Sequence, residues 1–538
     1  MPQRTDRLAL SSEVLGTVLR DQAAVAGDDT YLRMDERTLT FDDVNTTVNS
    51  IAFGLTELGV GKGDRISVLM ENSLEFVLVA LAANKIGAVW SPINTSYFGH
   101  WLGQAIEGSD ASLLVVDDRF VDRVLGLGAD GGNSLKRAVV LGRSEVVEEG
   151  GIQWLPFAQL DSGRTDEPNV DVEYADLATI IWTSGTTGRA KGAMLSHGYI
   201  PNQVPAWLAM KDARPGDVYY SYMPMYYGAA WLSIWEGLYA GLPVALDKAF
   251  SVGGFWDRIR YYGATQALVL GAMLVYLLEA PASPADRDNP LRICGSAPLP
   301  HELRGPFIER FGLEGMWTGF GQTETPLAVI SGALDTFKPG SAGRPRDDIE
   351  LKILDDTDRE VPVGEVGEIC VRPRIPFTTF SGYFRQPDVT LETFRNLWLH
   401  TGDLGRIDED GEVFFVDRKA DFVRHKGRNL SSFDAERAAI AHAGVYEVAA
   451  HGVPVDELAQ EDELKLCVVR APDAALTAEE LAAFINDTAP YFMVPRYIEF
   501  VDELPHTPSG KVQKHLLRKR GVTPETWDRV AAGFEVRR

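Results

Sequence analysis

The sequence predicts an α/β protein with parallel sheet layers and a small α+β part near its end. The first observation is an alternation in which an apolar strand at 65–70 and a strand at 88–91 flank an apolar helix that begins after Ser73. A strand, a helix and a second strand in succession favour parallel βαβ layering. The second observation is a capping box, in which Thr477 with Glu480 starts a helix over 478–485 in the smaller α+β part.

The other elements follow from spacing and from turn residues. Val44, Val48, Ile51 and Leu55 recur at helical spacing and predict an amphipathic helix over 41–58, which ends at glycine. The segment 110–116 continues the α/β pattern, 128–133 is a Gly/Asp loop, and 162–170 is interpreted as a linker. The run 178–182 is predicted to be a buried strand, and 291–298 another strand.

Bulk composition excludes several classes of protein. The 538 residues are 45% hydrophobic, so large cores can form, and the net charge of −25 argues against a nucleic-acid surface. Cys294, Cys370 and Cys467 lie far apart and predict neither a disulfide framework nor a metal site. The apolar segment 267–278 is too short to cross a bilayer, which takes about 20 residues. No signal segment is recognised at the N-terminus, so we expect a cytoplasmic protein without a membrane span.

A loop rich in glycine and hydroxyl residues follows the strand at 178–182. Glycines can turn successive N–H groups toward one point, hydroxyls add donors and lysine adds charge, so the loop suits a polyphosphate. It lacks the spacing of a Walker loop, and a plain surface turn is the structural alternative. The loop residues are Thr183, Ser184, Gly185, Thr186, Thr187, Gly188, Arg189, Ala190, Lys191 and Gly192.

These ten residues resemble the phosphate loop of the adenylate-forming superfamily, which includes acyl-CoA synthetases, firefly luciferases and the adenylation domains of peptide synthetases. Four more matches follow in the family's order, at 317–324, 401–403, 417–421 and 504–511. The resemblance implies a large multi-layered N-terminal domain at 1–417 and a small mobile domain at 418–538, with a hinge near Ala420. It also implies ATP, Mg²⁺ and coenzyme A.

The resemblance assigns roles to the matched residues. The phosphate loop, with Thr183 and Lys191 at its ends, would hold the β- and γ-phosphates, and Glu324 would hold Mg²⁺, which prefers oxygen ligands. Asp403, an acceptor when ionised, and Arg418 would hold the ribose. Lys511 would bridge the carboxylate and the α-phosphate. The remaining nucleotide and CoA positions are Gly295, Ser296, Ala297, Gly319, Phe320, Gly321, Gln322, Thr323, Arg424 and Gly427.

The acid substrate is expected at the aromatic motif 223–228 and at small residues elsewhere. Tyr227 stands where relatives often carry histidine, while Tyr219, Tyr220 and Trp235 are interpreted as core. Gly295 either deepens the pocket or simply turns the chain. The residues predicted to contact the acid are Tyr226, Tyr227, Trp231, Gly271, Gly295 and Gly319.

The resemblance is strongest to CoA ligases of the carnitine/crotonobetaine and medium-chain type. It implies an AMP-forming acyl-CoA synthetase that activates a bulky apolar or ring-containing acid through acyl-AMP. Three alternatives stay open: a carnitine-like acid as substrate, an enzyme that runs mainly one half-reaction or loads a carrier protein, and a nucleotide-binding protein without the full cycle. Departures at Tyr227, Ala420 and Val423-Arg424 keep the single half-reaction open, and those at Tyr227 and Ala420 keep the nucleotide-binding protein open. A homodimer and a partner enzyme are further open alternatives.

Overall fold

The computed structural model describes residues 14–127, 135–183, 191–419, 423–425, 428–430, 432–456, 461–489, 491–506 and 512–536. The chain divides into two compact units, each described by itself below. The first comprises Met1–Leu351, Val371–Leu399 and Asp410–Val413, and the second comprises Lys352–Cys370, His400–Glu409 and Phe414–Arg538.

The first unit contains an eight-stranded sheet in the order β10-β9-β4-β3-β5-β6-β8-β7. Pairing is parallel from β9 through β4, β3, β5 and β6 to β8, whereas β10 and β7 pair antiparallel at the two edges. The predicted parallel layering is therefore confirmed. The strands are β3 (Arg65–Leu69), β4 (Val89–Pro92), β5 (Leu113–Asp117), β6 (Arg137–Leu141), β7 (Val147–Glu149), β8 (Ile152–Pro156), β9 (Leu177–Thr183) and β10 (Lys191–Ser196).

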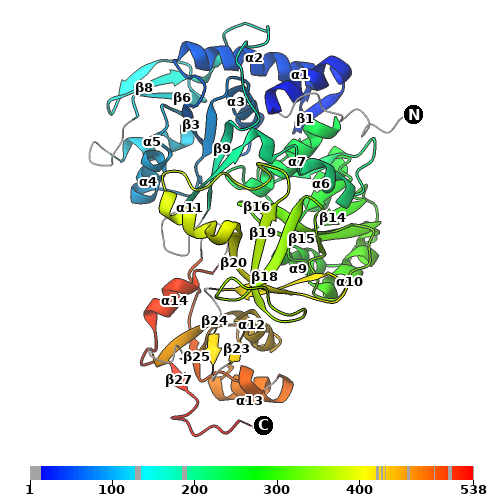
Figure 1. Cartoon of the computed structure of the whole chain (residues 1–538), viewed down its shortest axis with the longest axis vertical. Coiled ribbons are helices and arrows are strands. Elements are labelled where there is room, and N and C mark those ends of the chain that lie inside the picture. The colour runs from blue at the N-terminus through cyan, green and yellow to red at the C-terminus, as the bar shows by residue number, and fades with distance from the viewer. Residues whose placement is uncertain are drawn as a thin grey trace. The chain divides into compact units, whose positions relative to one another are not determined.

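Helices α1 (Leu15–Ala26), α2 (Phe41–Glu57) and α3 (Leu74–Lys85) pack side by side in this unit (Figure 1). The Ser73 hydroxyl accepts a hydrogen bond from the Phe76 N–H at 3.2 Å, which confirms the predicted cap. Every residue of α3 except Glu75 is buried, as its largely apolar sequence requires. Two shorter helices, α4 (Gly99–Ser109) and α5 (Val121–Leu125), follow.

The segment 162–170, predicted as a linker, has no helix or strand but is anchored. The Lys85 ammonium donates to Glu167 Oε2 at 2.6 Å and to the side-chain oxygens of Asn45 and Asn49. Because Lys85 is buried and belongs to α3, this ion pair fixes the segment to the helical layer.

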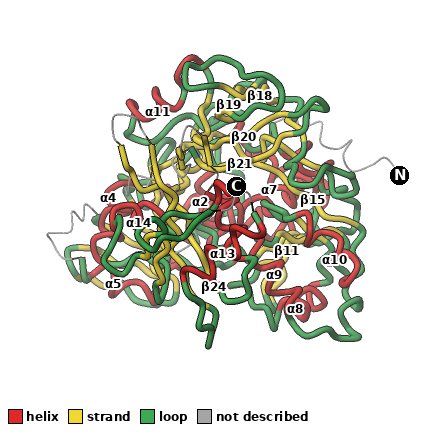
Figure 2. Tube along the Cα trace, turned by 90° about the horizontal axis from the view of Figure 1, so that it is seen from below, coloured by secondary structure: helices red, strands yellow, loops and turns green. Residues whose placement is uncertain are grey.

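A nine-stranded sheet in the order β17-β16-β15-β14-β13-β11-β12-β1-β2 completes the first unit. Figure 2 shows α8, α9 and α10 together beside β11, and Trp256 of α8 stacks on Phe311 of α10. The expected strand at 291–298 shortens to β14, and the apolar segment 267–278 divides into the end of β13 and most of α9. The strands are β1 (Thr30–Met34), β2 (Arg37–Thr40), β11 (Tyr219–Ser221), β12 (Val244–Leu246), β13 (Gln266–Leu268), β14 (Ile293–Gly295), β15 (Gly315–Gln322), β16 (Thr325–Ser331) and β17 (Arg344–Pro345). The helices are α6 (Val204–Met210), α7 (Gly228–Ala240), α8 (Phe255–Tyr262), α9 (Gly271–Glu279), α10 (His301–Phe311) and α11 (Pro387–Thr393).

The second unit is α+β, as predicted, with a four-stranded sheet β24-β25-β26-β27 and a two-stranded sheet β22-β23. The capping box of Thr477 and Glu480 is present at the start of α13. The elements are β22 (Val423–His425), β23 (Arg428–Leu430), α12 (Ser432–Ile440), β24 (Val445–Asp456), β25 (Glu461–Arg470), α13 (Ala478–Thr488), β26 (Tyr497–Phe500), α14 (Lys514–Arg520) and β27 (Trp527–Asp528).

A further sheet, in the order β18-β19-β20-β21, has strands whose residues are shared between the two units. Its strands are β18 (Ile349–Leu354), β19 (Gly367–Pro373), β20 (Leu399–Ile407) and β21 (Val413–Arg418). The compact units therefore do not divide at one point of the chain. The domain boundary at 417/418 stays a prediction, because the hinge residue Ala420 lies outside the described residues.

Short 3₁₀ turns lie at Asp118–Phe120, Phe157–Leu160, His197–Tyr199, Arg395–Leu397 and Tyr491–Met493. None of the helices in the described part of the chain combines the length and apolar character that a membrane crossing requires.

Candidate active site

The ends of the predicted phosphate loop are held side by side by β9 and β10. Thr183 and Lys191 are register partners, and the Thr183 hydroxyl donates to the Lys191 carbonyl oxygen at 3.3 Å. Both residues are half-buried. The loop residues between them, Ser184, Gly185, Thr186, Thr187 and Gly188 among them, lie outside the described part of the chain, so their phosphate contacts stay a prediction.

Glu324 lies in the turn between β15 and β16 and is buried. Its Oε1 accepts a hydrogen bond from the Tyr383 hydroxyl at 2.8 Å, and the Lys191 ammonium lies 5.0 Å from the centre of the Tyr383 ring. Burial and the negative charge of Glu324 both raise the pKa of Tyr383, so its hydroxyl keeps the proton that it donates. Tyr383 therefore links the predicted metal ligand to the predicted phosphate lysine.

Sequence reasoning missed Tyr383 and the segment that carries it. This segment runs along β10, where the Ser381 N–H donates to the Met194 carbonyl at 2.8 Å and the Phe384 N–H to the Gly192 carbonyl at 2.8 Å. The sequence signal was an aromatic group around Gly382, which has a φ of 116°. A pattern of this kind does not reveal which strand the segment will join.

The glycines of the 317–324 motif have a structural reason of their own. A Cβ on Gly319 would lie 2.6 Å from the Val329 carbonyl oxygen, and one on Gly321 would overlap the backbone of Leu327. Close approach of β16 therefore requires both glycines, while contact with the adenine base stays a prediction. Phe320 is buried, Gln322 and Thr323 are half-buried, and the Tyr199 hydroxyl donates to the Thr323 carbonyl at 2.8 Å.

The expected acid gate lies beside Thr323. The loop 222–227 leads into α7, and a Cβ on Gly228 at the start of this helix would lie 3.9 Å from the Thr323 hydroxyl. The Tyr226 and Tyr227 ring centres are 4.5 Å apart. Burial raises the pKa of Tyr226, and this outweighs hydrogen bonds from Ser96, Tyr227 and Thr95 that lower it. The Tyr226 phenol therefore stays neutral, and the two rings lie together near the nucleotide motif.

Trp231, which was predicted to contact the acid, is packed among other aromatic residues, and the contact with the acid stays a prediction. It is 1% exposed, and its ring lies 4.2 Å from Trp90, 5.6 Å from Phe76 and 6.1 Å from Trp235 between centres. This packing makes Trp231 a core residue, like Tyr219, Tyr220 and Trp235, for which the core interpretation is confirmed. A helix that is apolar nearly all round did not reveal which of its aromatic residues would face the site.

The small residues predicted as a pocket floor lie in two different surroundings. Gly295 belongs to β14 rather than to a turn, and a Cβ there would overlap the Trp317 indole ring. Gly271 begins α9, and the nearest atom to a Cβ there is the Pro298 carbonyl oxygen at 3.6 Å. Ser296 is fully buried and its hydroxyl donates to the same carbonyl at 2.9 Å, whereas Ala297 is half-buried.

In the second unit, β20 and β21 bring the two predicted ribose residues together. Arg418 Nε lies 3.5 Å from Asp403 Oδ1, with the Asp403 carboxylate buried and the Arg418 side chain 44% exposed. Arg424 pairs through its backbone with Asn429. The Arg424 side chain, Gly427 and the predicted catalytic Lys511 lie outside the described residues.

A buried network behind the ribose motif was not predicted. Glu368 Oε1 accepts the Gly402 N–H at 3.0 Å, and Oε2 accepts the Lys419 ammonium at 3.1 Å. The Lys419 N–H in turn donates to the Gly402 carbonyl at 2.9 Å. Burial raises the pKa of Glu368, but Lys419 and His400 lower it by more, so the net pKa is below the ordinary value.

Possible ligand atoms of Glu368, Cys370 and His400 lie within 4.8 Å of one another. The Lys419 ammonium already contributes positive charge to the same carboxylate, so this donor set does not favour a cation. Its geometry instead positions Gly402, which lies between the predicted ribose ligand Asp403 and Thr401.

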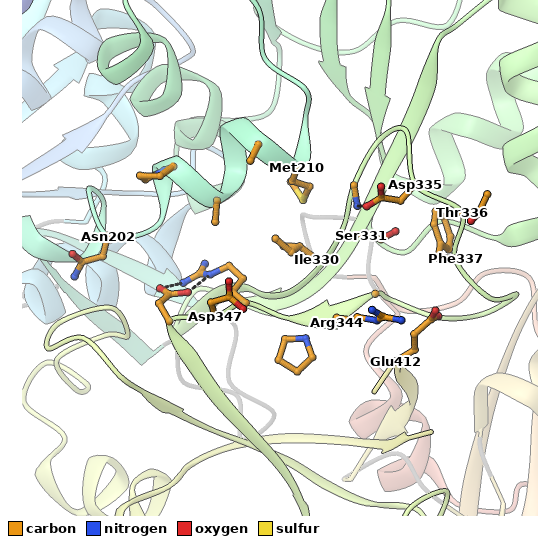
Figure 3. A pocket seen from close by; sticks show the side chains of 18 residues that line it. Asn202, Met210, Ile330, Ser331, Asp335, Thr336, Phe337, Arg344, Asp347 and Glu412 are labelled. Atoms are coloured by element: carbon orange, nitrogen blue, oxygen red, sulfur yellow. Dashed lines mark hydrogen bonds and ion pairs between the residues drawn. The ribbon is translucent and has the colours of Figure 1, made fainter. Parts of the chain in front are cut away.

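The first unit also has a cavity of about 800 Å³ between α6 and β16–β17. Figure 3 shows Met210 and Ile330 along it, with Asp335, Thr336 and Phe337 toward one end and Asn202 toward the other. An ion pair between Arg346 and Asp348, at 2.8 Å, closes part of its wall. Among the described residues that line it, none belongs to the predicted nucleotide or acid sites, so this cavity is separate from them.

Comparison with known proteins agrees with this geometry. A family model described as AMP-binding enzyme matches residues 19–384, and the AMP-binding enzyme C-terminal domain matches residues 434–511. A crotonobetaine/carnitine–CoA ligase of Salmonella agona (strain SL483) is 30% identical over 514 residues, covering 93% of this chain and 97% of that protein.

Two solved structures are similar over nearly their whole length. The anthranilate CoA ligase AuaEII, in complex with anthranoyl-AMP, has a TM-score of 0.82 and 25% identity, covering 97% of this chain and 98% of that one. ATP-bound MatB from Rhodopseudomonas palustris has a TM-score of 0.81 and 26% identity, covering 94% and 98%.

The fold and these matches define the class as AMP-forming ligases. Within that class, the chain belongs to the AMP-binding enzyme family, in the acyl-CoA synthetase branch of the adenylate-forming superfamily.

Proposed function

We propose that the protein converts a bulky, apolar or ring-containing carboxylic acid into its CoA thioester, using ATP. In the first step a carboxylate oxygen attacks the α-phosphorus of ATP, and the bond to pyrophosphate breaks to give acyl-AMP. In the second step the CoA sulfur attacks the acyl carbon, the carbon–oxygen bond to AMP breaks, and the thiol proton is released. Positioning and charge stabilisation supply most of the catalysis in transfers of this kind.

Each predicted site residue binds or positions a different part of ATP or of the acid. Lys191, beside Tyr383, neutralises phosphate charge, and Thr183 fixes the strand end from which the phosphate loop departs. Thr323 donates to the α-phosphate from its place beside the gate loop. Asp403 accepts the ribose hydroxyls while Arg418 holds its carboxylate in place. Lys511 binds the attacking carboxylate and the α-phosphate in the first step.

The site also fits Mg²⁺. The donor type is right, because Mg²⁺ takes oxygen ligands and commonly uses one or two carboxylates together with substrate phosphates. Glu324 offers such a carboxylate, oriented by the Tyr383 hydroxyl at 2.8 Å. When bound at Glu324, the ion would supply positive charge that offsets the negative charge of the phosphates.

The observation that carries the proposal is the group formed by Thr183, Lys191, Tyr383 and Glu324. It joins a phosphate-loop terminus, a cation and an oriented carboxylate within one unit, beside the aromatic loop expected to hold the acid. A protein that only binds a nucleotide, without catalysing a reaction, has no need of a carboxylate oriented to hold a metal ion at this place.

Two observations bear on the acid. Tyr226 and Tyr227 give an aromatic wall beside Thr323, and the similar ligase AuaEII holds an aromatic acyl-AMP, which together favour a ring-containing acid. The 30% identity to crotonobetaine/carnitine–CoA ligase favours the second candidate, a trimethylammonium acid held over an aromatic face.

The test is a panel of aromatic, aliphatic and trimethylammonium acids, each given with ATP, Mg²⁺ and CoA. AMP and the thioester are measured by chromatography and mass spectrometry. Aromatic or bulky apolar acids should give both products with the highest kcat/KM. Turnover of the trimethylammonium acids alone would replace the first candidate by the second. Acyl-AMP and pyrophosphate without thioester would point to a carrier-protein acceptor.

The same preparation tests the proposal on assembly. We propose a cytoplasmic enzyme that completes both steps without a partner enzyme, and a homodimer is the alternative to a monomer. Light scattering of the active preparation measures the mass directly against 59.1 kDa per chain.

A further inference from the structure

The loop that carries Tyr226 and Tyr227 is held by side chains rather than by a sheet. The Asn72 amide donates to the Met223 carbonyl oxygen at 2.9 Å, and its oxygen accepts the Met225 N–H at 2.9 Å. The Trp231 indole N–H donates to the Met225 carbonyl oxygen at 2.8 Å. Residue 225 is thus fixed at its N–H by one side chain and at its carbonyl by another.

These hydrogen bonds satisfy backbone groups that would otherwise be buried without partners. Met223 and Met225 are 7% and 2% exposed, and Pro224 between them has no N–H to contribute. An amide side chain can donate and accept hydrogen bonds at the same time, and Asn72 does both. Its Nδ2 group also donates a second hydrogen bond, to the Asp247 carbonyl oxygen at 2.9 Å. The path of the loop therefore depends on Asn72 and Trp231.

Both side chains stand on rigid supports. Asn72 directly precedes Ser73, which caps the helix α3, and all residues of this helix except Glu75 are buried. The Trp231 ring is fixed by Phe76, Trp90 and Trp235. Because rigid side chains hold both the N–H and the carbonyl group of Met225, the aromatic rings that follow this residue keep one orientation.

We propose that Asn72 and Trp231 are positioning residues of the acid site, which hold residue 225 so that Tyr226 and Tyr227 face the acid. Trp231 thus acts on the acid through the loop rather than by touching it. The inference rests on the proposed function, since it assumes that the two tyrosines contact the acid.

The chain offers a matched pair of variants. Trp231→Phe removes one buried hydrogen bond, to the Met225 carbonyl, and leaves a ring among the aromatic neighbours. Tyr31→Phe also removes one buried hydrogen bond, from the Tyr31 hydroxyl to the Ile234 carbonyl of α7 at 2.9 Å, but away from the loop. Any general cost of losing such a bond is common to both variants.

Trp231→Phe should raise the KM for the acid roughly fivefold, the effect of about one hydrogen bond, while the KM for ATP changes by less than about twofold. Tyr31→Phe should leave both KM values unchanged. Asn72→Ala should raise the acid KM further, and the double variant with Trp231→Phe should show less than the product of the two effects, because both act on residue 225.

Amide hydrogen exchange gives a readout that does not need activity. Exchange in the peptide spanning 222–228 should accelerate in Trp231→Phe and not in Tyr31→Phe. Equal exchange in the two variants, or equal acid KM values, would overturn the inference, and Trp231→Phe suffices if Asn72→Ala does not fold. Faster loop exchange in a protein that activates no acid would leave the positioning intact and overturn the proposed function instead.

Discussion

Trp317 lies across Gly295, and this packing decides what a substitution there does. A methyl group at Gly295 would overlap the indole ring, whereas one at Gly271 would lie 3.6 Å from its nearest atom, an ordinary contact. Gly295→Ala should therefore lower the free energy of unfolding by about 1–3 kcal/mol, the usual cost of overpacking. Gly271→Ala should change it by no more than about 0.5 kcal/mol.

Denaturant unfolding of the two variants checks this prediction, and equal midpoints would contradict it. This difference decides which of the two glycines is suited to a change of acid preference. Leucine at Gly295 would disturb the core as well as any pocket, so its effect on acid preference would be hard to interpret. Gly271 is the better position for a substitution intended to change the acid preference.

The Tyr383 hydroxyl orients Glu324, and its removal should affect the metal-dependent step. Tyr383→Phe should lower the rate of acyl-AMP formation roughly tenfold and raise the Mg²⁺ concentration needed for half-maximal rate, as loss of a ligand's supporting hydrogen bond commonly does. Tyr174→Phe is the control, since its hydroxyl donates to the Pro376 carbonyl at 2.7 Å in the same segment. If both variants lose activity alike, the effect belongs to the segment and not to Glu324.

At the scale of elements, Glu368 on β19 connects β20 to the residue that follows β21. Glu368→Gln should cost about 2 kcal/mol of unfolding free energy at neutral pH, a usual value for hydrogen bonds to a charged group. The net pKa of Glu368 lies below the ordinary 4.5, despite burial that raises it, because Lys419 and His400 lower it. A lowered pKa gives stability that is present above pH 4.5 and is lost as the pH falls through the folded value.

The difference in unfolding free energy between wild type and Glu368→Gln should therefore shrink below pH 4.5. Glu360→Gln is the matched control, because its ion pair with Lys352, at 2.7 Å, is a surface contact with little expected effect on stability. A difference for Glu368→Gln that stays constant with pH would show that its charge does not matter.

The elements that sequence could predict are those with strong local signals. The strand, helix and strand at 65–92 and the cap at Ser73 follow from apolar runs and one hydroxyl, and these are present. The motifs also singled out Glu324, Asp403 and Arg418, because each motif is short and local. The structure brings Asp403 and Arg418 together, while the roles of all three residues stay predictions. Tyr383, Asn72 and Glu368 were missed because their importance comes from contacts with residues far away in the sequence. The core packing of Trp231 was not predicted, because aromatic residues of a buried helix look alike until the packing is known.

At the scale of the whole molecule, the chemistry has two steps that one chain must serve. The sequence contains the residues that the resemblance assigns to adenylation and to thioester formation. The resemblance also places an acid gate at Tyr227, a hinge at Ala420 and a CoA loop after Val423-Arg424, where this chain differs from the expected pattern, and these assignments stay predictions. We expect both steps to occur, because each motif that the family uses to contact ATP is retained.

Lys511→Ala should separate the two steps. The lysine is proposed to bind the attacking carboxylate and the α-phosphate, so its loss should lower acyl-AMP formation by about a hundredfold or more, as loss of a group that stabilises transition-state charge does. Thioester formation from synthetic acyl-AMP and CoA should fall by less than about threefold, because this assay bypasses the attack on the α-phosphorus of ATP. Pyrophosphate release without CoA measures the first step, and thioester release measures the second. Wild-type protein must give comparable rates in the two assays if it runs the full cycle. A wild type silent in the first assay and active in the second would show that the departures have removed adenylation, whereas equal losses in both assays for Lys511→Ala would assign the lysine a role common to the two steps.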